Sequence, residues 1–386
     1  MPLVWLSIGK GRLNIEGYRM IVIADDITGA AEMAGIAHAN GLHVRMVCSV
    51  VGGSLTHNGV DAHVIVTDTR SMTQDEAVEE THRIASQLPK QSLIFKKTDS
   101  ALRGHVVAEL RALMAVTGYR RAVYMPANPS KGRIIRDGTY FIDGIPLAET
   151  AFSYDPEFPA HTSVLRERFP DAEAAGIIMP DAVTVKDIHN IVEYYHDGDT
   201  LFAGGADLFL EYSLQRREAL PTTYTREVVR GGVSSLLVLC GSTQSKPQLM
   251  GLAESPMPLT VYDGSHDLQP WLADALPKYL SSGSLMLTIP HRHRTGRVAA
   301  IHLRQMMAAM ASQLMQSLSE SPPQCLVIEG GATAYATLQQ LNVDRLSVTG
   351  QIASGVVSLQ ADNGLRIILK PGSYPLNMNQ MNELLC

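Results

Sequence analysis

Charged side chains gather at three points in the first half of the chain, each directly after a short apolar run that is typical of a buried strand. The three groups are Asp25 with Asp26, Asp68 with Arg70, and Lys97 with Asp99, Ser100 and Arg103. An arginine binds a carboxylate through two parallel N–H···O bonds, whereas an aspartate accepts hydrogen bonds from hydroxyls and can take a proton from one. The combination suits a small anion that carries several hydroxyls. A structural network of ion pairs is the alternative for the Lys97 group.

Asp25 and Asp26 stand between the apolar run 21–24 and a stretch of small residues that predicts a helix over 30–40. At the carboxyl end of a parallel strand, both aspartates would face a ligand, and Gly29 would let the backbone approach that ligand closely. The alternative is that Asp26 only caps the helix.

The order of the predicted elements indicates how these groups could meet. Strands are predicted over 44–50, 62–66, 92–96, 121–125, 175–179 and 200–204, with helices over 73–86, 106–116 and 184–195. Such alternation is typical of a doubly wound parallel sheet, in which the carboxyl ends of the strands converge on one cleft. An insertion over 127–149 contains a stretch, 136–144, that reads as a short hairpin with an Asp-Gly turn at either end, and we expect the insertion to cover that cleft.

The second half carries two loops rich in Gly, Ser and Thr, at 241–245 and 330–333, each directly after a predicted strand. Backbone N–H groups of such turns bind phosphates at the start of a helix, although ordinary strand–helix turns share this composition. A long amphipathic helix over 298–318 follows the basic run 291–294, which is either a solvated loop or a phosphate contact. The sequence has no Walker A motif and no Gly-x-Gly-x-x-Gly after a strand, which disfavours a P-loop ATPase and a nicotinamide enzyme.

Length and composition favour two domains. The chain has 386 residues, of which 45% are hydrophobic and 18% charged, and its net charge of −6 disfavours nucleic-acid or membrane partners. Four widely spaced cysteines predict free thiols in a reducing cytoplasm, and no run approaches the roughly 18 apolar residues of a membrane span. We expect a non-core leader over 1–19, domains over 20–215 and 233–386, and a linker over 216–232.

These motifs resemble those of the four-carbon acid sugar kinases. The resemblance rests on Ala-Asp-Asp-Ile-Thr-Gly-Ala at 24–30, Asp-Thr-Arg-Ser at 68–71, Lys-Lys-Thr-Asp-Ser-Ala-Leu-Arg-Gly at 96–104, and the glycines and aspartates of 132–144. The second half is similar to the family more loosely, at 241–242, 330–334 and 370–372. It departs from the family pattern at Ala332, where an acidic residue is frequent, and at Pro371.

The resemblance implies an α/β fold of two domains, each a mainly parallel sheet flanked by helices, with the active site in the cleft between them. It implies transfer of phosphate from ATP, with Mg²⁺, to a hydroxyl of a four-carbon sugar acid, with D-threonate preferred to D-erythronate and 3-oxo-tetronate. Their places at neighbouring strand ends make Asp26 and Asp99 the candidate catalytic carboxylates, and we favour Asp26 as the base, because it lies close to the switch point and because Lys97 and Arg103 should lower the pKa of Asp99. By resemblance, the acid would contact Asp26, Arg70, Lys97, Thr98, Asp99, Ser100 and Arg103, and ATP would contact Ser242, Gly330, Gly331, Ala332, Thr333 and Gly372.

Two other classes of function stay open at this point. Ala332 is compatible with a sugar-acid-binding protein that has lost nucleotide turnover. A phosphosugar lyase or isomerase could use the same carboxylates without ATP. The expected partners are a small sugar acid and ATP, a homodimer is compatible with the sequence, and no residue is assigned to a metal.

Overall fold

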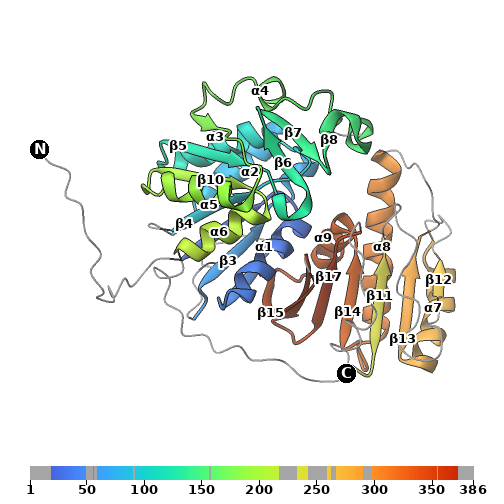
Figure 1. The fold of residues 1–386 in the computed structure, drawn as a ribbon. Coiled ribbons are helices and arrows are strands. Elements are labelled where there is room, and N and C mark those ends of the chain that lie inside the picture. Colours follow the sequence, from blue (N-terminus) through green and yellow to red (C-terminus); the bar gives the residue numbers. More distant parts are fainter. Residues whose placement is uncertain are drawn as a thin grey trace, which may run out of the picture.

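The computed structural model describes residues 19–48, 55, 59–89, 92–155, 158–216, 233–241, 259–261, 267–289, 297–353 and 355–372. Its first half contains seven parallel strands in the order β2-β3-β1-β4-β10-β5-β9 (Figure 1). They are β1 (Met20–Ala24), β2 (Val44–Val47), β3 (Ala62–Val66), β4 (Leu93–Lys97), β5 (Arg121–Met125), β9 (Ile177–Ile178) and β10 (Thr200–Gly204). The chain turns from β3 back across β1 to β4, so the switch point of the sheet lies beside β1.

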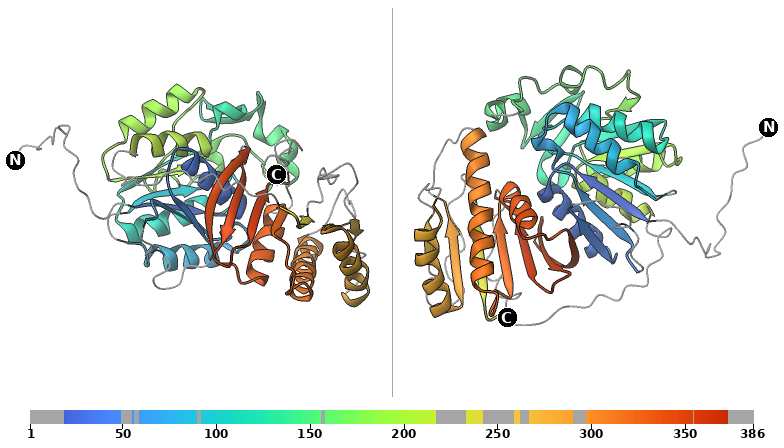
Figure 2. Two further views of the ribbon diagram at one scale, coloured as in Figure 1. Left: turned by 90° about the horizontal axis from the view of Figure 1, so that it is seen from below. Right: turned by 180° about the vertical axis from the view of Figure 1, so that it is seen from behind.

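Helices cover both faces of this half-sheet, as its alternating sequence predicts. On one face lie α1 (Ile27–Ala39), α5 (Val185–Tyr194) and α6 (Ala206–Arg216), and on the other α2 (Gln74–Ala85) and α3 (Val106–Thr117), which Figure 2 shows from behind. A capping box between Thr73 and Glu76 begins α2. The small residues of α1 let it pack deeply, and ten of its residues are buried.

The expected insertion forms a separate three-stranded antiparallel sheet of β6 (Arg133–Arg136), β7 (Thr139–Ile142) and β8 (Ile145–Pro146). Both Asp-Gly turns have positive φ at each residue: 52° and 69° at Asp137 and Gly138, and 50° and 80° at Asp143 and Gly144. This is the backbone that favours Asp-Gly in two-residue hairpin turns, so the hairpin prediction is confirmed.

The second half is a mixed sheet in the order β12-β13-β11-β14-β17-β16-β15. The first five strands run parallel, and β16 and β15 are antiparallel. The strands are β11 (Leu236–Cys240), β12 (Leu259–Val261), β13 (Ser284–Thr288), β14 (Cys325–Glu329), β15 (Arg345–Ala353), β16 (Val356–Ala361) and β17 (Arg366–Lys370). The helices are α7 (Gln269–Ser282), α8 (Arg297–Ser317) and α9 (Gly331–Gln340), and α4 (Leu165–Arg168) is a single turn in the first half.

Strand β15 pairs antiparallel with β2, so the two half-sheets form one sheet of fourteen strands. Helix α1 packs against β15 and β16 of the second half as well as against its own strands (Figure 1). A Cβ on Gly35 of α1 would lie 2.7 Å from Cγ1 of Val357, which shows how closely the helix lies on β16. The prediction of an α/β fold with mainly parallel strands flanked by helices is confirmed, whereas the joining of the two sheets was not predicted.

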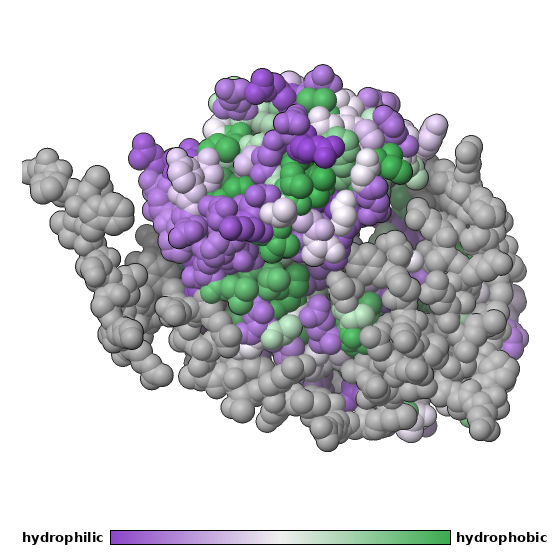
Figure 3. Space-filling model, viewed as in Figure 1, coloured by the Kyte–Doolittle hydropathy of each residue, from purple (hydrophilic) through white to green (hydrophobic). Residues whose placement is uncertain are grey.

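The remaining predictions concern the leader, the linker, two loops of the second half, the cysteines and membrane-spanning segments. Residues 1–18 of the leader, 217–232 of the linker, Ser242 and the basic run 291–294 lie outside the described residues. Arg19, the last leader residue, accepts a hydrogen bond from the backbone N–H of Leu93 at 2.9 Å. Cys48, Cys240 and Cys325 are buried free thiols, as expected. Each helix in the described ranges is too short or too polar to cross a bilayer, and Figure 3 shows hydrophilic residues interspersed with hydrophobic ones over the described part of one face.

Candidate active site

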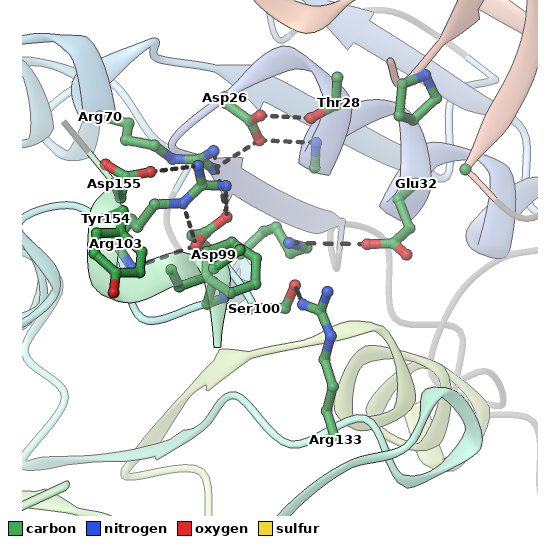
Figure 4. Close-up of a pocket in the computed structure, with 17 residues that line it drawn as sticks. Asp26, Thr28, Glu32, Arg70, Asp99, Ser100, Arg103, Arg133, Tyr154 and Asp155 are labelled. Carbon is green, nitrogen blue, oxygen red and sulfur yellow. Dashed lines mark hydrogen bonds and ion pairs between the residues drawn. The ribbon is translucent and has the colours of Figure 1, made fainter. Parts of the chain in front are cut away.

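A cavity of about 380 Å³ lies at the carboxyl ends of β1 and β4 and reaches the second half of the chain (Figure 4). Side chains that follow β1, β3 and β4 line most of it, which is the convergence that the strand order predicts. The second half contributes Gly355 and Pro371. Residues of both halves therefore share this cavity.

Asp26 both caps α1 and lines the cavity. Its Oδ1 accepts a hydrogen bond from the N–H of Gly29 at 2.8 Å, and its Oδ2 accepts one from Thr28 Oγ1 at 2.5 Å. The two interpretations of Asp26 in the sequence are therefore compatible. Burial alone would raise the pKa of Asp26, but Arg70, Lys97 and these two hydrogen bonds outweigh burial and lower it.

Arg70 organises three carboxylates from two strand ends. Its Nε and Nη2 bind Asp25 in a bidentate pair, with both distances at 3.0 Å. Nη2 also lies 2.9 Å from Asp26 Oδ1, and Nη1 lies 3.3 Å from Asp99 Oδ1. Burial lowers the pKa of Arg70 on its own, but the three aspartates raise it well above its ordinary value. Burial dominates at Asp25, whose pKa is raised despite its pairing with Arg70.

Asp99 is held by a second arginine from its own loop. Arg103 donates from Nε to Oδ2 at 2.9 Å and from Nη2 to Oδ1 at 2.8 Å, and the N–H of Ala101 donates to Oδ2 at 2.9 Å. Arg103 also lies 3.3 Å from Asp155. Burial alone would raise the pKa of Asp99, but the two arginines outweigh it and hold that pKa well below the ordinary value. The ion-pair network that the sequence left as an alternative is therefore present, and it lines the cavity.

A second cluster of charges surrounds Glu32 and was missed from the sequence. Glu32 lies one turn into α1 and is only 8% exposed. Its Oε1 accepts from Lys131 Nζ at 2.6 Å, and its Oε2 lies 3.8 Å from Lys97 Nζ. Lys97 also donates to the carbonyl oxygen of Thr98 at 2.7 Å. Arg133 of β6 donates to Ser100 Oγ and lines the cavity, so the hairpin insertion does reach the site.

Most of the predicted sugar-acid residues meet in this cavity. Its lining includes Asp26, Arg70, Lys97, Asp99, Ser100 and Arg103. Thr98 is not part of that lining, and its side chain is buried. Phe152, Tyr154 and Asp155 complete the wall from a short 3-10 helix (Ala151–Tyr154) and the residue that follows it, and none of the three was predicted from the sequence.

The described residues that the sequence predicts to contact ATP lie in the second half, and none of them lines this cavity. Gly330 has a φ of 100°, which side-chain-bearing residues rarely adopt, and α9 begins directly after it. A Cβ on Gly241 would lie 1.9 Å from Oγ1 of Thr333, so the loop after β11 and the start of α9 are in close contact. Ala332 is exposed on the first turn of α9. Such a loop and helix start offer backbone N–H groups to a phosphate.

Known proteins match both halves. Residues 20–171 match a model described as a sugar-binding N-terminal domain, and residues 252–374 match one described as a nucleotide-binding C-terminal domain. The D-threonate kinase of Salmonella typhimurium is 26% identical over 90% of this chain and 88% of its own length. The 3-oxo-tetronate kinase of Brucella melitensis is 33% identical over 38% of this chain and 35% of its own length. The chain belongs to the four-carbon acid sugar kinase family.

The kinase also shares its fold with solved structures. A protein from Salmonella typhimurium superposes with a TM-score of 0.73 over 94% of the kinase and 98% of its own chain. A protein from Haemophilus influenzae gives a TM-score of 0.70 over 94% and 99%. Both are 21% identical to the kinase, so this likeness concerns the fold alone.

A buried lysine–glutamate pair lies beneath the loops of each half of the kinase. Lys370 Nζ lies 3.1 Å from Glu329, with both side chains 1% exposed, at paired positions of β17 and β14. In the first half, Lys96 Nζ lies 2.6 Å from Glu109, which also accepts a hydrogen bond from Thr69 at 2.9 Å. Thr69 directly precedes Arg70, Pro371 directly follows Lys370, and both Arg70 and Pro371 line the cavity. Each pair therefore lies at the base of a segment that reaches the cavity.

Proposed function

We propose that this kinase transfers the terminal phosphate of ATP to a hydroxyl of D-threonate. The observation that carries the proposal is the cavity of about 380 Å³ in which paired carboxylates face lysine and arginine side chains. A sugar acid needs cations for its carboxylate and acceptors for its hydroxyls. The similarity to the D-threonate kinase of Salmonella typhimurium supports the choice of acid, because it extends over 90% of this chain.

The proposed division of labour follows the two halves. Residues 20–215 would hold the sugar acid, and residues 233–386 would hold the nucleotide, with 216–232 as the linker. Gly355 and Pro371 line the same cavity as the charged residues, which supports a site shared by both. On this proposal the start of α9 and the loops at Gly241 and Gly372 face the phosphates.

Lys97, Arg103 and Arg133 are the proposed cations for the carboxylate of the acid. Arg70 makes four contacts with three aspartates, so its role is to align carboxylates rather than to bind the acid alone. Asp26 and Asp99 would then accept hydrogen bonds from the sugar hydroxyls. We assign Asp26 to the hydroxyl that attacks, because it lies at the end of β1 beside the switch point.

The low pKa of Asp26 agrees with this assignment in a phosphoryl transfer. The transition state is loose in most descriptions, so the carboxylate has to orient the hydroxyl and receive its proton late rather than remove it in advance. Asp99 is held by two arginines and by the backbone N–H groups of Ala101 and Arg103, which suits a fixed binding group. We therefore keep Asp26 as the proposed catalytic carboxylate and give Asp99 mainly a binding role.

We also propose that Mg²⁺ accompanies ATP. In the described ranges no three His, Cys, Asp or Glu side chains are arranged to hold a metal ion. With so few ligands from these side chains, Mg²⁺ would fit the site only if phosphate oxygens and water supply most of its coordination, as is usual for magnesium nucleotides. When bound, the ion would neutralise charge on the phosphate oxygens.

3-Oxo-tetronate is the second candidate substrate. The 3-oxo-tetronate kinase of Methylobacterium radiotolerans is 26% identical over 91% of this chain and 95% of its own length. A keto oxygen only accepts hydrogen bonds, so it cannot form one with a carboxylate oxygen. A hydroxyl, in contrast, can donate a hydrogen bond to a carboxylate. The pairing of Asp26 with Asp99 in one cavity therefore favours an acid with hydroxyls along its chain.

The test is ATP consumption with D-threonate, D-erythronate and 3-oxo-tetronate at matched concentrations. We expect the highest kcat/KM with D-threonate. A higher kcat/KM with either other acid would transfer the assignment to that acid. Acid binding without ATP consumption would show a silent binding protein, and conversion of an acid phosphate without ATP would show a lyase or isomerase.

The buried free thiols support our further proposal that the kinase works in a reducing cytoplasm.

A further inference from the structure

Thr28 contacts both halves of the kinase at the point where they meet. It is the second residue of α1, and its Oγ1 donates to Asp26 Oδ2 at 2.5 Å, as Figure 4 shows. On its other side lies the start of α9, where a Cβ on Gly331 would be only 2.6 Å from Thr28 Cγ2. The hydroxyl of Thr28 therefore faces the sugar-acid site, and its methyl group faces the proposed nucleotide loop.

The contact with Thr28 explains why residue 331 is a glycine. Gly331 has no positive φ, and it lies in the first turn of a helix, where alanine is intrinsically more favourable than glycine. The other atoms near an added Cβ, Ile27 Cγ2 and Thr28 Oγ1, are 3.6 Å away. Only the methyl group of Thr28 is too close. The missing Cβ at 331 is thus a packing requirement set by one atom of the first half.

We propose that Thr28 is a positioning residue that couples the nucleotide loop to the carboxylate of Asp26. The proposal rests on the proposed function, in which α9 faces the phosphates and Asp26 faces the attacking hydroxyl. Oγ1 and Cγ2 are carried by the same Cβ, so any rotation about χ1 moves both. A threonine in a helix has few χ1 rotamers to choose from. The methyl group wedged against Gly331 therefore fixes the direction of the hydroxyl that holds Asp26.

The contacts continue from Asp26 to Arg70 at 2.9 Å and from there to Asp99 at 3.3 Å. A nucleotide that shifts the start of α9 would act on this chain of contacts through Thr28. Coupling of this kind is reciprocal, so the sugar acid would alter nucleotide affinity by the same factor. Coupled sites typically change each other's affinity by about 5–150-fold.

Two substitutions separate the two branches of the side chain. Thr28→Val keeps the shape against Gly331 and removes the donor to Asp26. We expect kcat to fall by about 10–150-fold, the value of one charge-assisted hydrogen bond, with the KM for ATP within about twofold. Thr28→Ser keeps the donor and removes the methyl group. We expect it to keep kcat within about threefold and to reduce the coupling between the two ligands to less than about twofold.

The coupling is measured by calorimetric titration of the sugar acid with and without a non-hydrolysable ATP analogue. The packing contact is tested separately by combining substitutions. Gly331→Ala should lower the midpoint of thermal unfolding and the affinity for the ATP analogue. Adding Thr28→Ser to the same chain should restore most of the midpoint and most of the affinity. Gly330→Ala is the matched control, because its φ of 100° makes its cost independent of Thr28.

The outcomes distinguish this inference from the proposed function. A wild-type kinase that consumes no ATP with any acid of the panel and binds neither ligand would overturn both. An active wild type overturns the coupling alone if Thr28→Ser retains the coupling or Thr28→Val retains kcat. Equal losses from Gly331→Ala with Thr28 and with Thr28→Ser would overturn the contact on which the coupling depends.

Discussion

The two halves of the site differ in which part of the chain meets the cleft. In the first half, Arg70 cross-links aspartates from two strand ends and Arg103 holds Asp99, so charged side chains are fixed before any ligand arrives. In the second half, Gly355 and Pro371 line the cavity without a charged side chain, and the charged pair of Glu329 and Lys370 is buried. Among the described residues, the first half therefore lines the cavity mainly with fixed charged side chains, whereas the second half lines it with a glycine and a proline.

Because of this difference, we expect substitutions in the two halves to weaken the protein for different physical reasons. Replacing a charged side chain in the first half removes a binding or reacting group and leaves other charges without their partners. Replacing a glycine in the second half adds an atom where backbone or a neighbour needs the space.

The largest effect is expected for Asp26→Asn. This substitution keeps the size of the side chain but removes the proton acceptor, so kcat should fall by about 10²–10⁴-fold while the acid still binds. Asp99→Asn is the matched variant in the same network and should mainly raise KM. Steady-state kinetics with both variants checks this. A kcat that is lost in Asp99→Asn and kept in Asp26→Asn would reverse the assignment.

The next effect concerns the buried pairs that anchor both loops. Lys370→Met and Lys96→Met each leave a buried glutamate without its lysine, and each should reduce the free energy of unfolding by about 3–5 kcal/mol. Urea unfolding of the two variants measures this. Adding Glu329→Gln to Lys370→Met should recover much of the loss, because the remaining side chains are neutral. If the double variant is no more stable than Lys370→Met alone, the unpaired charge on Glu329 is not the cause of the reduced free energy of unfolding.

A much smaller effect is expected from pH. Because the pKa of Asp26 lies below its ordinary value of 3.8, its carboxylate stays ionised well below neutral pH. The stability that Asp26 and Asp99 contribute is present above that value and is lost as the pH falls through their lowered pKa values. We expect kcat/KM to stay flat between about pH 5 and about pH 8. An acid limb near pH 6 that disappears in Asp26→Asn would contradict the lowered pKa.

The sequence predicted the parts of the fold that depend on local pattern. Strands 62–66, 121–125 and 200–204 have the predicted bounds. Helix α1 begins at Ile27, three residues before the predicted start, because Asp26 caps it. Helix α6 was not predicted. Nor was the β15–β16 pair, which joins the half-sheets through β2. The pairing of β15 with β2 connects segments far apart in the chain, and β15 has register shifts between Val348 and Gly350 and between Gln351 and Ala353, so its sequence shows no regular strand period.

The same limit applies to the site. The charged residues next to predicted strands could be assigned from the sequence because a parallel sheet brings its strand ends together. Glu32 could not, because its partner Lys131 lies 99 residues away on a different element. A signal did exist: Glu32 is the one charged residue in a helix otherwise built from small and apolar residues and a histidine. A buried acid on such a helix needs a cation, and that reasoning would have found the cluster.

The division of labour between the halves is tested most directly by calorimetric titration of both ligands into a few variants. Lys97→Met and Arg103→Ala should each weaken the binding free energy of the sugar acid by about 1.5–3 kcal/mol. Neither should change the affinity for a non-hydrolysable ATP analogue appreciably. Gly330→Ala should do the reverse, and Lys186→Met on the exposed face of α5 should change neither. Equal losses of both ligands in Lys97→Met and Arg103→Ala, with normal binding in Lys186→Met, would contradict the account.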